Sequence, residues 1–346
     1  MKLPRRFNLT LGFAGLLVFM SMFAEFLSSN PPTRQNLDNF YHPPSRIHFF
    51  DNNGRFHFGP FIYRTELAEP LDITYRENTQ SIYPLAYFFR GYRYKLFGMI
   101  SMNLHLVGRG QAPFFYPFGT DELGRDVLAR VLSGARTSLM VVVLGMIVYA
   151  VLGMTIGSIA GLLGGWVDAL LMRFSEFVLA LPALYLVLAL RALLPMGIPY
   201  WQTLFLTVST IAVIAWPPMA RGIRGLILQI RESMYVEASL SLGAAPGHIF
   251  LHHILPSLLP FALTQTVLAA PLFLLGEVVL SFLNVGFRDE GESWGSMLRG
   301  LKDTRVITDF WWNLLPLALV FLTLLFLNAT ISRLSSKDPR DQVIRI

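Results

Sequence analysis

The chain has 346 residues, of which 53% are hydrophobic and only 14% charged, and its mean hydropathy is +0.50. A soluble domain usually carries about 25% charged residues, so this composition argues against a large soluble enzyme and favours an integral membrane protein. The lack of cysteine excludes disulfides, thiolate metal sites and cysteine nucleophiles, and the net charge of +6 is more simply explained by arginines in cytoplasmic loops than by nucleic-acid binding.

Six apolar runs are long enough to cross a bilayer as helices, which takes about 20 residues each. Helices are expected because backbone groups in lipid must find their partners within the segment. The sequence therefore predicts an all-α polytopic membrane protein with six transmembrane helices. They fall near 8–28, 138–161, 168–193, 203–220, 257–284 and 311–333.

The first apolar run follows Lys2, Arg5 and Arg6 and lacks a small-residue cleavage site, which favours a retained anchor over a signal peptide. We therefore expect residues 1–29 to form the N-terminal cytoplasmic tip and the first span. The basic start places the N-terminus in the cytoplasm, and six crossings return the tail at 334–346 to the same side.

Residues 30–118 are then expected to form an extracytoplasmic insert. Within it, "RIHFFDNNGRFHFGPFIY" alternates around Asn53-Gly54, a pattern that predicts a β-hairpin. A small β-containing domain is expected, with a structureless spacer as the alternative for 65–100.

The next segment reads "FGTDELGRDVLARVLSGARTSL" at 118–139. Asp121 or Thr120 could cap a helix. The apolar residues that follow would form a stripe, with Arg125 and Arg130 off it. The stripe consists of Val127, Leu128, Val131 and Leu132. This pattern predicts an amphipathic helix at 119–137 on the outer membrane surface, with a helix of a soluble outer domain as the alternative.

A row of glycines recurs every four residues in the second apolar region: Gly153, Gly157, Gly161 and Gly165. Such a row lets the backbone of a neighbouring helix come close, and a merely glycine-rich helix end is the alternative. Further along, Pro182 should kink the third span.

Several kinds of site are missing from the pattern. There is no phosphate-binding loop of the G-x-x-x-x-G-K-[ST] kind. His248, His252 and His253 come with no HExxH and no obvious third ligand. No serine or carboxylate pair is typical of an enzyme. We therefore expect no ATP site, no metal centre and no catalytic residue in this chain.

The stretch "EASLSLGAAPGHIFLHHILP" begins at Glu237, between two strongly apolar blocks. Gly243 can end one helix in a left-handed cap, and Pro246 suits the start of a second. Two short helices with a bend between them would make a compact knob that docks into a groove on a partner. An ordinary interfacial elbow is the alternative.

Glu237-Ala238, Gly243 and "HILP" at 253–256 resemble the EAA loop of binding-protein-dependent ABC importer permeases, and "HILP" is usual in the oligopeptide and dipeptide branch. In that family the loop docks on the ATP-hydrolysing subunit. The resemblance therefore implies a docking and coupling role for Glu237, Ala238, Gly243, Pro246, His253, Ile254, Leu255 and Pro256.

Other blocks extend the resemblance to about 118–333. The segment 118–139 resembles the one before the second span in this branch. The matching positions are Gly119, Thr120, Asp121, Gly124, Arg125, Asp126, Arg130, Gly134, Arg136, Ser138 and Leu139. "GGWVDALLMRFSEFVLALP" and "GEVVLSFLNVGFRDEGESWGSML" also match, whereas the 30–118 insert is longer than the loops of ordinary dipeptide permeases.

Two acidic residues, Glu176 and Glu277, lie in or near spans, at positions where this family tends to carry an acid. Ionisable groups are costly in the membrane and usually face a cavity or a partner. Glu176 could pair with Arg173 one turn before it. Glu277 could face the translocation path or a helix contact.

The resemblance implies the type I ABC importer transmembrane fold of a second-permease, "C-type" subunit, with a core at 138–333 and a cytoplasmic coupling loop at 221–256. The chain would move di- or oligopeptides by alternating access and bind no cofactor, while partner subunits use ATP and Mg. The implied partners are a homologous permease, two cytoplasmic ATPase subunits, an extracytoplasmic solute-binding protein and the bilayer of a bacterial inner membrane, with no nucleic acid. An ion-coupled secondary transporter, or a permease for nickel or another small solute, are the alternatives.

Overall fold

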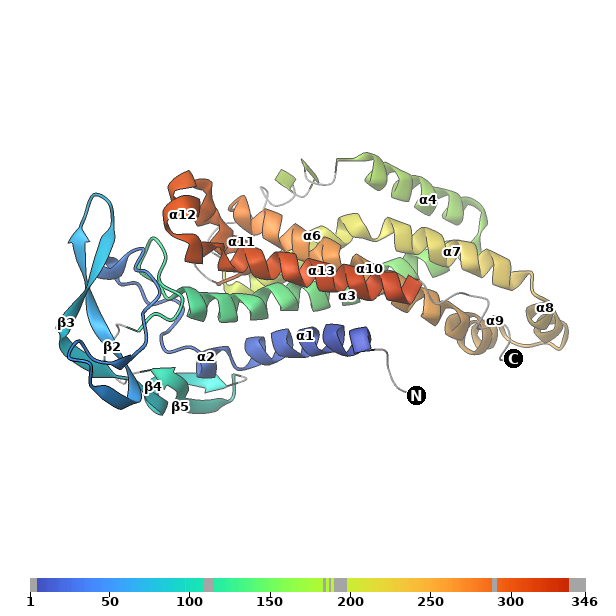
Figure 1. The fold of residues 1–346 in the computed structure, drawn as a ribbon. Helices are drawn as coiled ribbons and strands as arrows, with labels where there is room; N and C mark the ends of the chain where they lie inside the picture. Colours follow the sequence, from blue (N-terminus) through green and yellow to red (C-terminus); the bar gives the residue numbers. More distant parts are fainter. Residues whose placement is uncertain are drawn as a thin grey trace. The chain divides into compact units, whose positions relative to one another are not determined.

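The structure is a computed structural model that describes residues 5–96, 98–108, 115–182, 185–186, 188–189, 198–287 and 291–335 (Figure 1). The chain divides into two compact units. Unit 1 comprises Met1–Ser138 and Ser281–Thr323, and unit 2 comprises Leu139–Leu280 and Leu324–Ile346.

Unit 1 opens with helix α1 (Arg5–Met22), which breaks at Phe23 and continues as the single turn α2 (Ala24–Leu27). The helix predicted near 8–28 is present in this interrupted form. A short 3-10 turn, Leu37–Asn39, follows.

Two antiparallel sheets come next in unit 1. Strands β1 (His48–Phe50), β2 (Phe56–Glu69) and β3 (Thr74–Pro84) pair in that order, and β4 (Ala86–Leu96) pairs with β5 (Ile100–Gly108). The predicted hairpin at Asn53-Gly54 is confirmed. Gly54 has a φ of +75°, and the Asp51 carboxylate accepts hydrogen bonds from the backbone of Asn53 and Arg55 at 2.9 and 2.8 Å. The spacer alternative for 65–100 is wrong, because strands occupy most of that range.

The first long helix, α3, runs from Val127 to Leu163. The helix predicted over 119–137 therefore begins only at Val127, and residues 119–126 form turns. The carboxylate of Asp126 caps the helix by accepting from the backbone N–H groups of Leu128 and Ala129 at 2.9 and 3.3 Å. The prediction that Asp121 or Thr120 makes the cap is wrong.

The later elements of unit 1 are short and lead into the last helix. They are α11 (Trp294–Met297), a 3-10 turn (Leu298–Lys302), α12 (Thr304–Asp309), a second 3-10 turn (Trp311–Leu314) and α13 (Leu315–Ser335). Their apolar side chains pack on the start of α3 in a core of Val127, Val131, Val306, Phe310 and Trp312.

In the described part of unit 2 the regular secondary structure is helical, with short turns between the helices. Its elements besides parts of α3 and α13 are α4 (Gly165–Ala180), α6 (Tyr200–Ala215), α7 (Pro217–Arg231), α8 (Met234–Ser241), α9 (Pro246–Ile249), a π-helical turn (Phe250–Ile254) and α10 (Leu255–Phe282). Helix α4 ends before Pro182, as expected for a proline break, and part of the predicted third span lies outside the described residues.

Three helices are long and apolar enough to cross a membrane: Val127–Leu163, Pro246–Phe282 and Trp311–Ser332. The pair α6 and α7, bent by 49°, raises this to four if it is one span. The apolar part of α1, Gly12–Met22, is shorter. These counts of candidate spans concern the described residues alone. They establish a mostly helical chain with three to four candidate spans and a β-sheet region.

Three of the four glycines in the predicted row form a seam with α7. A Cβ on Gly153 would lie 2.2 Å from the Met219 side chain, and one on Gly157 would lie 2.5 Å from the carbonyl oxygen of Ala220. At Gly161 the nearest atom belongs to Ile227, at 2.9 Å. Gly165 is not part of this seam. It has a φ of +56° and open space around it, because α3 has ended and the chain turns there.

A prediction follows for the seam. Gly157→Ala should lower the free energy of unfolding by about 1–3 kcal/mol, because the added methyl group meets a backbone oxygen that cannot rotate away. The measurement is the thermal midpoint of the purified protein in detergent. Gly225→Ala in α7 is the matched control, since a Cβ there meets nothing within 4 Å and alanine is the better helix former. Equal midpoints for the two variants would contradict a tight seam.

A buried histidine lies at the centre of unit 1. His42 is 1% exposed, and its ring nitrogens contact the carbonyl oxygen of Pro43 at 2.6 Å and the hydroxyl of Thr65. The rings of Tyr75 and Tyr116 surround it. Burial lowers the pKa of His42 to about 4, because the desolvation of the charged ring outweighs the hydrogen bond to the Pro43 carbonyl, which favours the charged form.

The pH dependence of stability follows from this shift. The unfolded chain binds a proton at His42 below about 6.5, whereas the folded chain binds it only below about 4. Stability should therefore fall as the pH drops from 6.5 to 4, by up to about 3 kcal/mol from this group. Thermal midpoints across this range test it. His42→Phe should flatten the slope, and an unchanged slope in this variant would contradict the assignment.

Candidate coupling site and its connection to the helices

The loop between α8 and α9 is held by its own backbone. Gly243 has a φ of +83°. Its N–H donates to the carbonyl of Leu240 at 2.9 Å, and the N–H of Ala244 donates to the carbonyl of Ser239 at 3.1 Å. This pair of bonds is a Schellman motif, so the predicted left-handed cap at Gly243 is confirmed.

The second helix of the knob differs from the prediction in one respect. Pro246 is the first residue of α9, as predicted, but the helix does not stop before the membrane-like run. It passes through the π-helical turn at Phe250–Ile254 into α10. The widened turn lies directly before Pro256, whose missing N–H removes one helical hydrogen bond. The second helix of the knob is therefore the first part of a long helix, Pro246–Phe282 (Figure 1).

The surface of the knob is apolar at its tip. Met234 and Leu242 are 86% and 88% exposed, and Leu240 and Leu251 are also exposed. Beneath them Val236, Ile249 and Ile254 are buried and fix the shape. Several exposed large apolar side chains within one short segment are typical of a surface that another protein covers.

The polar residues of the knob are accessible. Glu237 and Ala238 are exposed, and His253 is half-buried. None of the ion pairs among the described residues involves Glu237. The rings of His248 and His252 stack at 4.1 Å. The described residues contain no group of three or more potential metal ligands.

Helix α7 connects the knob to the rest of unit 2. The coupling loop predicted at 221–256 begins later than expected, because residues up to Arg231 are helical. Arg221, Arg224 and Arg231 belong to this amphipathic helix. The prediction placed these arginines in a loop because the mean hydropathy of the segment is low. The apolar residues Met219, Ile223 and Ile227, which recur at helical spacing, are the signal that could have revealed the helix.

The arginines of α7 fix it to neighbouring helices. Arg224 contacts both oxygens of Asp168 on α4, the second at 2.6 Å. Arg231 donates to the carbonyl of Gly161 at 3.0 Å. Glu176 pairs with Arg173 at 3.1 Å, as predicted, and with Arg221 at 3.4 Å. Asp168 was missed in the sequence, because its partner is 56 positions away.

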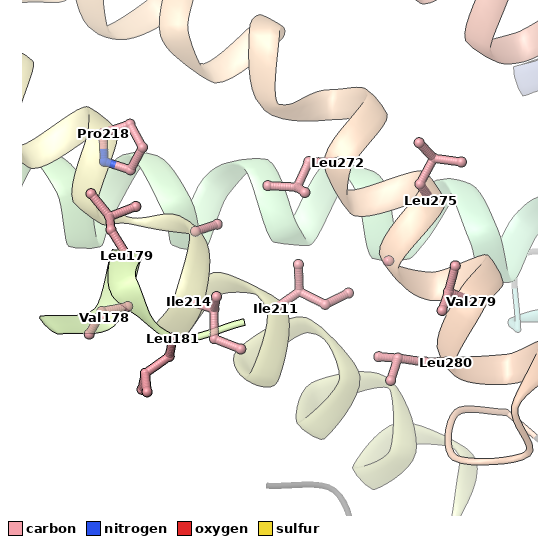
Figure 2. Close-up of a pocket in the computed structure, with 12 residues that line it drawn as sticks. Val178, Leu179, Leu181, Ile211, Ile214, Pro218, Leu272, Leu275, Val279 and Leu280 are labelled. Carbon is pink, nitrogen blue, oxygen red and sulfur yellow. The ribbon is translucent and has the colours of Figure 1, made fainter. Parts of the chain in front are cut away.

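An apolar cavity of about 370 Å³ lies where α4 ends beside α6 and α10 (Figure 2). Every lining residue is apolar. They are Val178, Leu179, Leu181, Ile211, Ile214, Ala215, Pro218, Leu272, Leu275, Gly276, Val279 and Leu280. Side chains of this kind offer no hydrogen bonds, so the cavity fits apolar groups and gives a polar solute nothing to hold it.

Glu277 lies next to this cavity in sequence but is fully buried and does not line it. On either side of it, a Cβ on Gly276 would lie 3.0 Å from the Ile211 side chain, and Val278 is buried. These facts agree with the helix-contact alternative for Glu277 and not with an open path.

The residues 119–130 form a buried charge cluster in unit 1. Arg125 donates to Asp121 at 2.8 Å, and Arg130 contacts both Asp121 and Glu292, the latter at 2.7 Å. Arg125 and Arg130 are only 8% and 5% exposed. The prediction that both lie on a polar face at the membrane surface is therefore wrong. Each arginine is stable inside the unit because acidic partners neutralise it.

The glycines of this segment allow close contact with the chain before the sheets. A Cβ on Gly124 would lie 1.8 Å from the carbonyl oxygen of Asn36, and one on Gly119 would lie 2.6 Å from that of His42. Both glycines have positive φ. The carbonyl of Thr120 accepts from the indole of Trp312 at 2.9 Å. The segment thus joins distant parts of unit 1.

Arg136 joins two further elements. Its guanidinium donates to both carboxylate oxygens of Glu25 at 2.6 and 2.7 Å and to the carbonyl of Ser21 at 3.0 Å. Helix α3 is therefore bound to the end of α1 and to α2 by a bidentate pair, the strongest geometry for such contacts.

Comparison with known proteins identifies the family. Residues 153–338 match the family described as binding-protein-dependent transport system inner membrane component. The chain is 36% identical to the oligopeptide transport system permease protein OppC of Escherichia coli (strain K12), over 65% of this chain and 72% of the relative. It is 33% identical to OppC of Haemophilus influenzae, over 66% and 71%. It is 36% identical to the dipeptide transport system permease protein DppC of Bacillus subtilis, over 61% and 64%.

Since the family match spans more than half of the chain, the protein belongs to the inner membrane components of binding-protein-dependent transport systems. It is a multi-pass permease subunit of an ABC importer and not a catalytic subunit. A secondary transporter driven by an ion gradient is thereby excluded.

The charge cluster of unit 1 generates a prediction. Arg130→Met should lower the free energy of unfolding by about 3–5 kcal/mol, because Asp121 and Glu292 are left buried without their shared partner. Chemical denaturation followed by tryptophan fluorescence measures this, since Trp294 and Trp312 lie in the same unit. The matched control is Arg76→Met: Arg76 and Glu69 are largely exposed and 3.9 Å apart, and such a pair contributes less than about 1 kcal/mol. Similar losses for both variants would contradict the assignment.

Proposed function

We propose that this permease forms half of the pathway of an importer for di- or oligopeptides. The support is the peptide substrate named for its relatives in Escherichia coli, Haemophilus influenzae and Bacillus subtilis. The other half is a homologous permease, two cytoplasmic ATPase subunits use ATP and Mg, and a solute-binding protein delivers the peptide from outside.

The proposed topology has six spans with both termini in the cytoplasm. Three helices and the bent α6–α7 pair have suitable length and composition. Helix α1 and the span predicted at 168–193, of which only part lies within the described residues, are assigned to the other two crossings. The arginines of α7 support a cytoplasmic position for the knob, which places residues 30–118 outside.

The observation that carries the mechanism is the knob at residues 232–256, which has a locally fixed backbone and an exposed apolar tip. A shape that is held by its own hydrogen bonds does not need the partner in order to form. Docking into an ATPase groove then loses little conformational entropy. Glu237, exposed at the same place, offers a charge to a basic residue of the partner.

A movement of the knob reaches the cavity through a short series of contacts. Helix α8 follows α7 after Glu232 and Ser233. Helix α7 is held on α3 by the glycine seam and on α4 by Asp168. At its other end α7 adjoins α6, whose residues Ile211 and Ile214 line the cavity. The ATPase dimer shifts the permease because it binds the knob differently in its two states.

The test is a substitution at the bend. Gly243→Val should reduce ATPase stimulation by the loaded binding protein about 5- to 30-fold. A side chain at this φ costs about 1–2 kcal/mol, which disfavours the docking shape by that factor. The measurement is ATP hydrolysis by the reconstituted importer with and without binding protein and peptide.

Gly247→Val is the matched control, because a Cβ there also has open space but φ is not positive. Glu237→Arg should reduce stimulation while keeping the shape. All three variants should reach the membrane at normal levels, since the spans are unchanged. Wild-type stimulation in both Gly243→Val and Glu237→Arg would contradict the coupling role and leave the segment as an ordinary interfacial bend.

A further inference from the structure

The hairpin of β4 and β5 has an unusual composition. Residues 86–108 contain three basic residues, Arg90, Arg93 and Lys95, and no aspartate or glutamate, and they are rich in aromatic side chains. All three basic residues are exposed. Basic and aromatic residues together, without acidic ones, are typical of protein surfaces at the boundary between lipid and water.

One end of the hairpin is fixed to α2. His105 is fully buried, and its Nδ1 lies 2.8 Å from the carbonyl oxygen of Glu25 and 2.9 Å from that of Ser28. The hydroxyl of Ser29 donates to the carbonyl of Val107 at 2.5 Å. These contacts hold the hairpin at the point where the chain leaves α2.

That point marks the end of an apolar surface. Helix α1 exposes large apolar side chains at Leu16, Val18, Phe19 and Met22, each more than 40% exposed. Such a helix suits lipid better than water. The run stops at Met22, only three residues before Glu25, so the hairpin is attached where lipid contact ends.

The other end of the hairpin is free and apolar. Met99 is 86% exposed and Ile100 56% exposed. Ile100 and His105 are five positions apart along the strand, which allows a reach of roughly 16 Å from the fixed end. Figure 1 shows the hairpin beside α2, close to the end of α1.

The geometry points to a membrane contact. We propose that the β4–β5 hairpin rests on the outer leaflet, with Met99 and Ile100 about 5–10 Å into the headgroup and acyl boundary. Arg93 and Lys95 lie at the level of the phosphates of anionic phospholipids. The contact would hold the outer end of α1 at the interface. The choice of the outer leaflet rests on the topology proposed above.

The chain has no cysteine, so single labels are easily placed. Met99→Cys carries an environment-sensitive nitrobenzoxadiazole group in the complete importer, reconstituted in nanodiscs of phosphatidylcholine with phosphatidylglycerol. Phe58→Cys is the control, because Phe58 lies in β2 of the same unit and is 99% exposed. Quenching is measured with lipids that carry a shallow nitroxide and with aqueous iodide.

The label at Met99 should be quenched by the nitroxide lipid and several-fold less by iodide than the label at Phe58. Arg93→Glu with Lys95→Glu should reduce the lipid quenching in anionic nanodiscs, and pure phosphatidylcholine should reduce it likewise. Equal iodide quenching at both positions would overturn the proposal. Protection that appears only when binding protein is added would also overturn it, since the hairpin would then be a protein contact.

The topology is tested separately. An impermeant maleimide added to spheroplasts should react with Phe58→Cys. Failure of that reaction counts against the proposed orientation, whereas quenching by lipid at Met99 reports only on the membrane contact. The proposed orientation and the proposed membrane contact can therefore be contradicted independently of each other.

Discussion

The arrangement of unit 2 depends on how closely α3 and α7 approach each other. Three glycines on α3 present no side chain, so the backbone of α7 at Ala220 comes within contact of the α3 backbone. Helices that approach this closely gain dispersion contacts along their whole length. The other contacts that link α7 to its neighbours, and so to the knob, depend on this close approach of α3 and α7. With α7 fixed on α3, Arg224 reaches Asp168 on α4 and Arg231 reaches the end of α3. The position of α8 is then set by the direction of α7.

Unit 1 uses charge where unit 2 uses close packing. Its turns at 119–126 have little apolar surface to bury, so they are held by Arg125 and Arg130 on Asp121 and Glu292. A buried pair of this kind contributes little net stability compared with apolar groups of the same shape, but it is costly to leave half-paired. The cluster therefore specifies one arrangement of three separate segments. Arg136 likewise specifies one arrangement of two segments, because it binds α3 to Glu25 of α2.

The sequence predicted features whose cause is local. The hairpin turn at Asn53-Gly54, the left-handed cap at Gly243 and the start of α9 at Pro246 each depend on the backbone preference of one residue. The pair of Arg173 and Glu176 depends on a spacing of three within a helix. Features set by distant partners could not be predicted. Arg130 and Glu292 are 162 positions apart, so periodicity assigned Arg130 to a solvent-facing side. Helix α7 was read as a loop for a related reason, because its arginines lower the mean hydropathy while distant carboxylates compensate them.

The joint between α6 and α7 decides whether the knob can influence the cavity. A flexible joint would absorb the movement of α7. The structure shows a joint that is hydrogen-bonded on both sides of the bend. Trp216 lies at the bend, and its N–H donates to Ala212 at 3.2 Å while its carbonyl accepts from Ala220 at 3.1 Å. Hydrogen bonding therefore continues on both sides, even though Pro217 contributes no N–H. The Trp216 side chain is buried and stacks on Phe174 of α4 at 6.1 Å. In the proposed mechanism these contacts transmit a rotation of α7 to α6 and to the end of α4. These two helices provide Ile211, Ile214 and Val178 to the cavity wall, so in the proposed mechanism a movement of the knob reaches the cavity through α7 and α6.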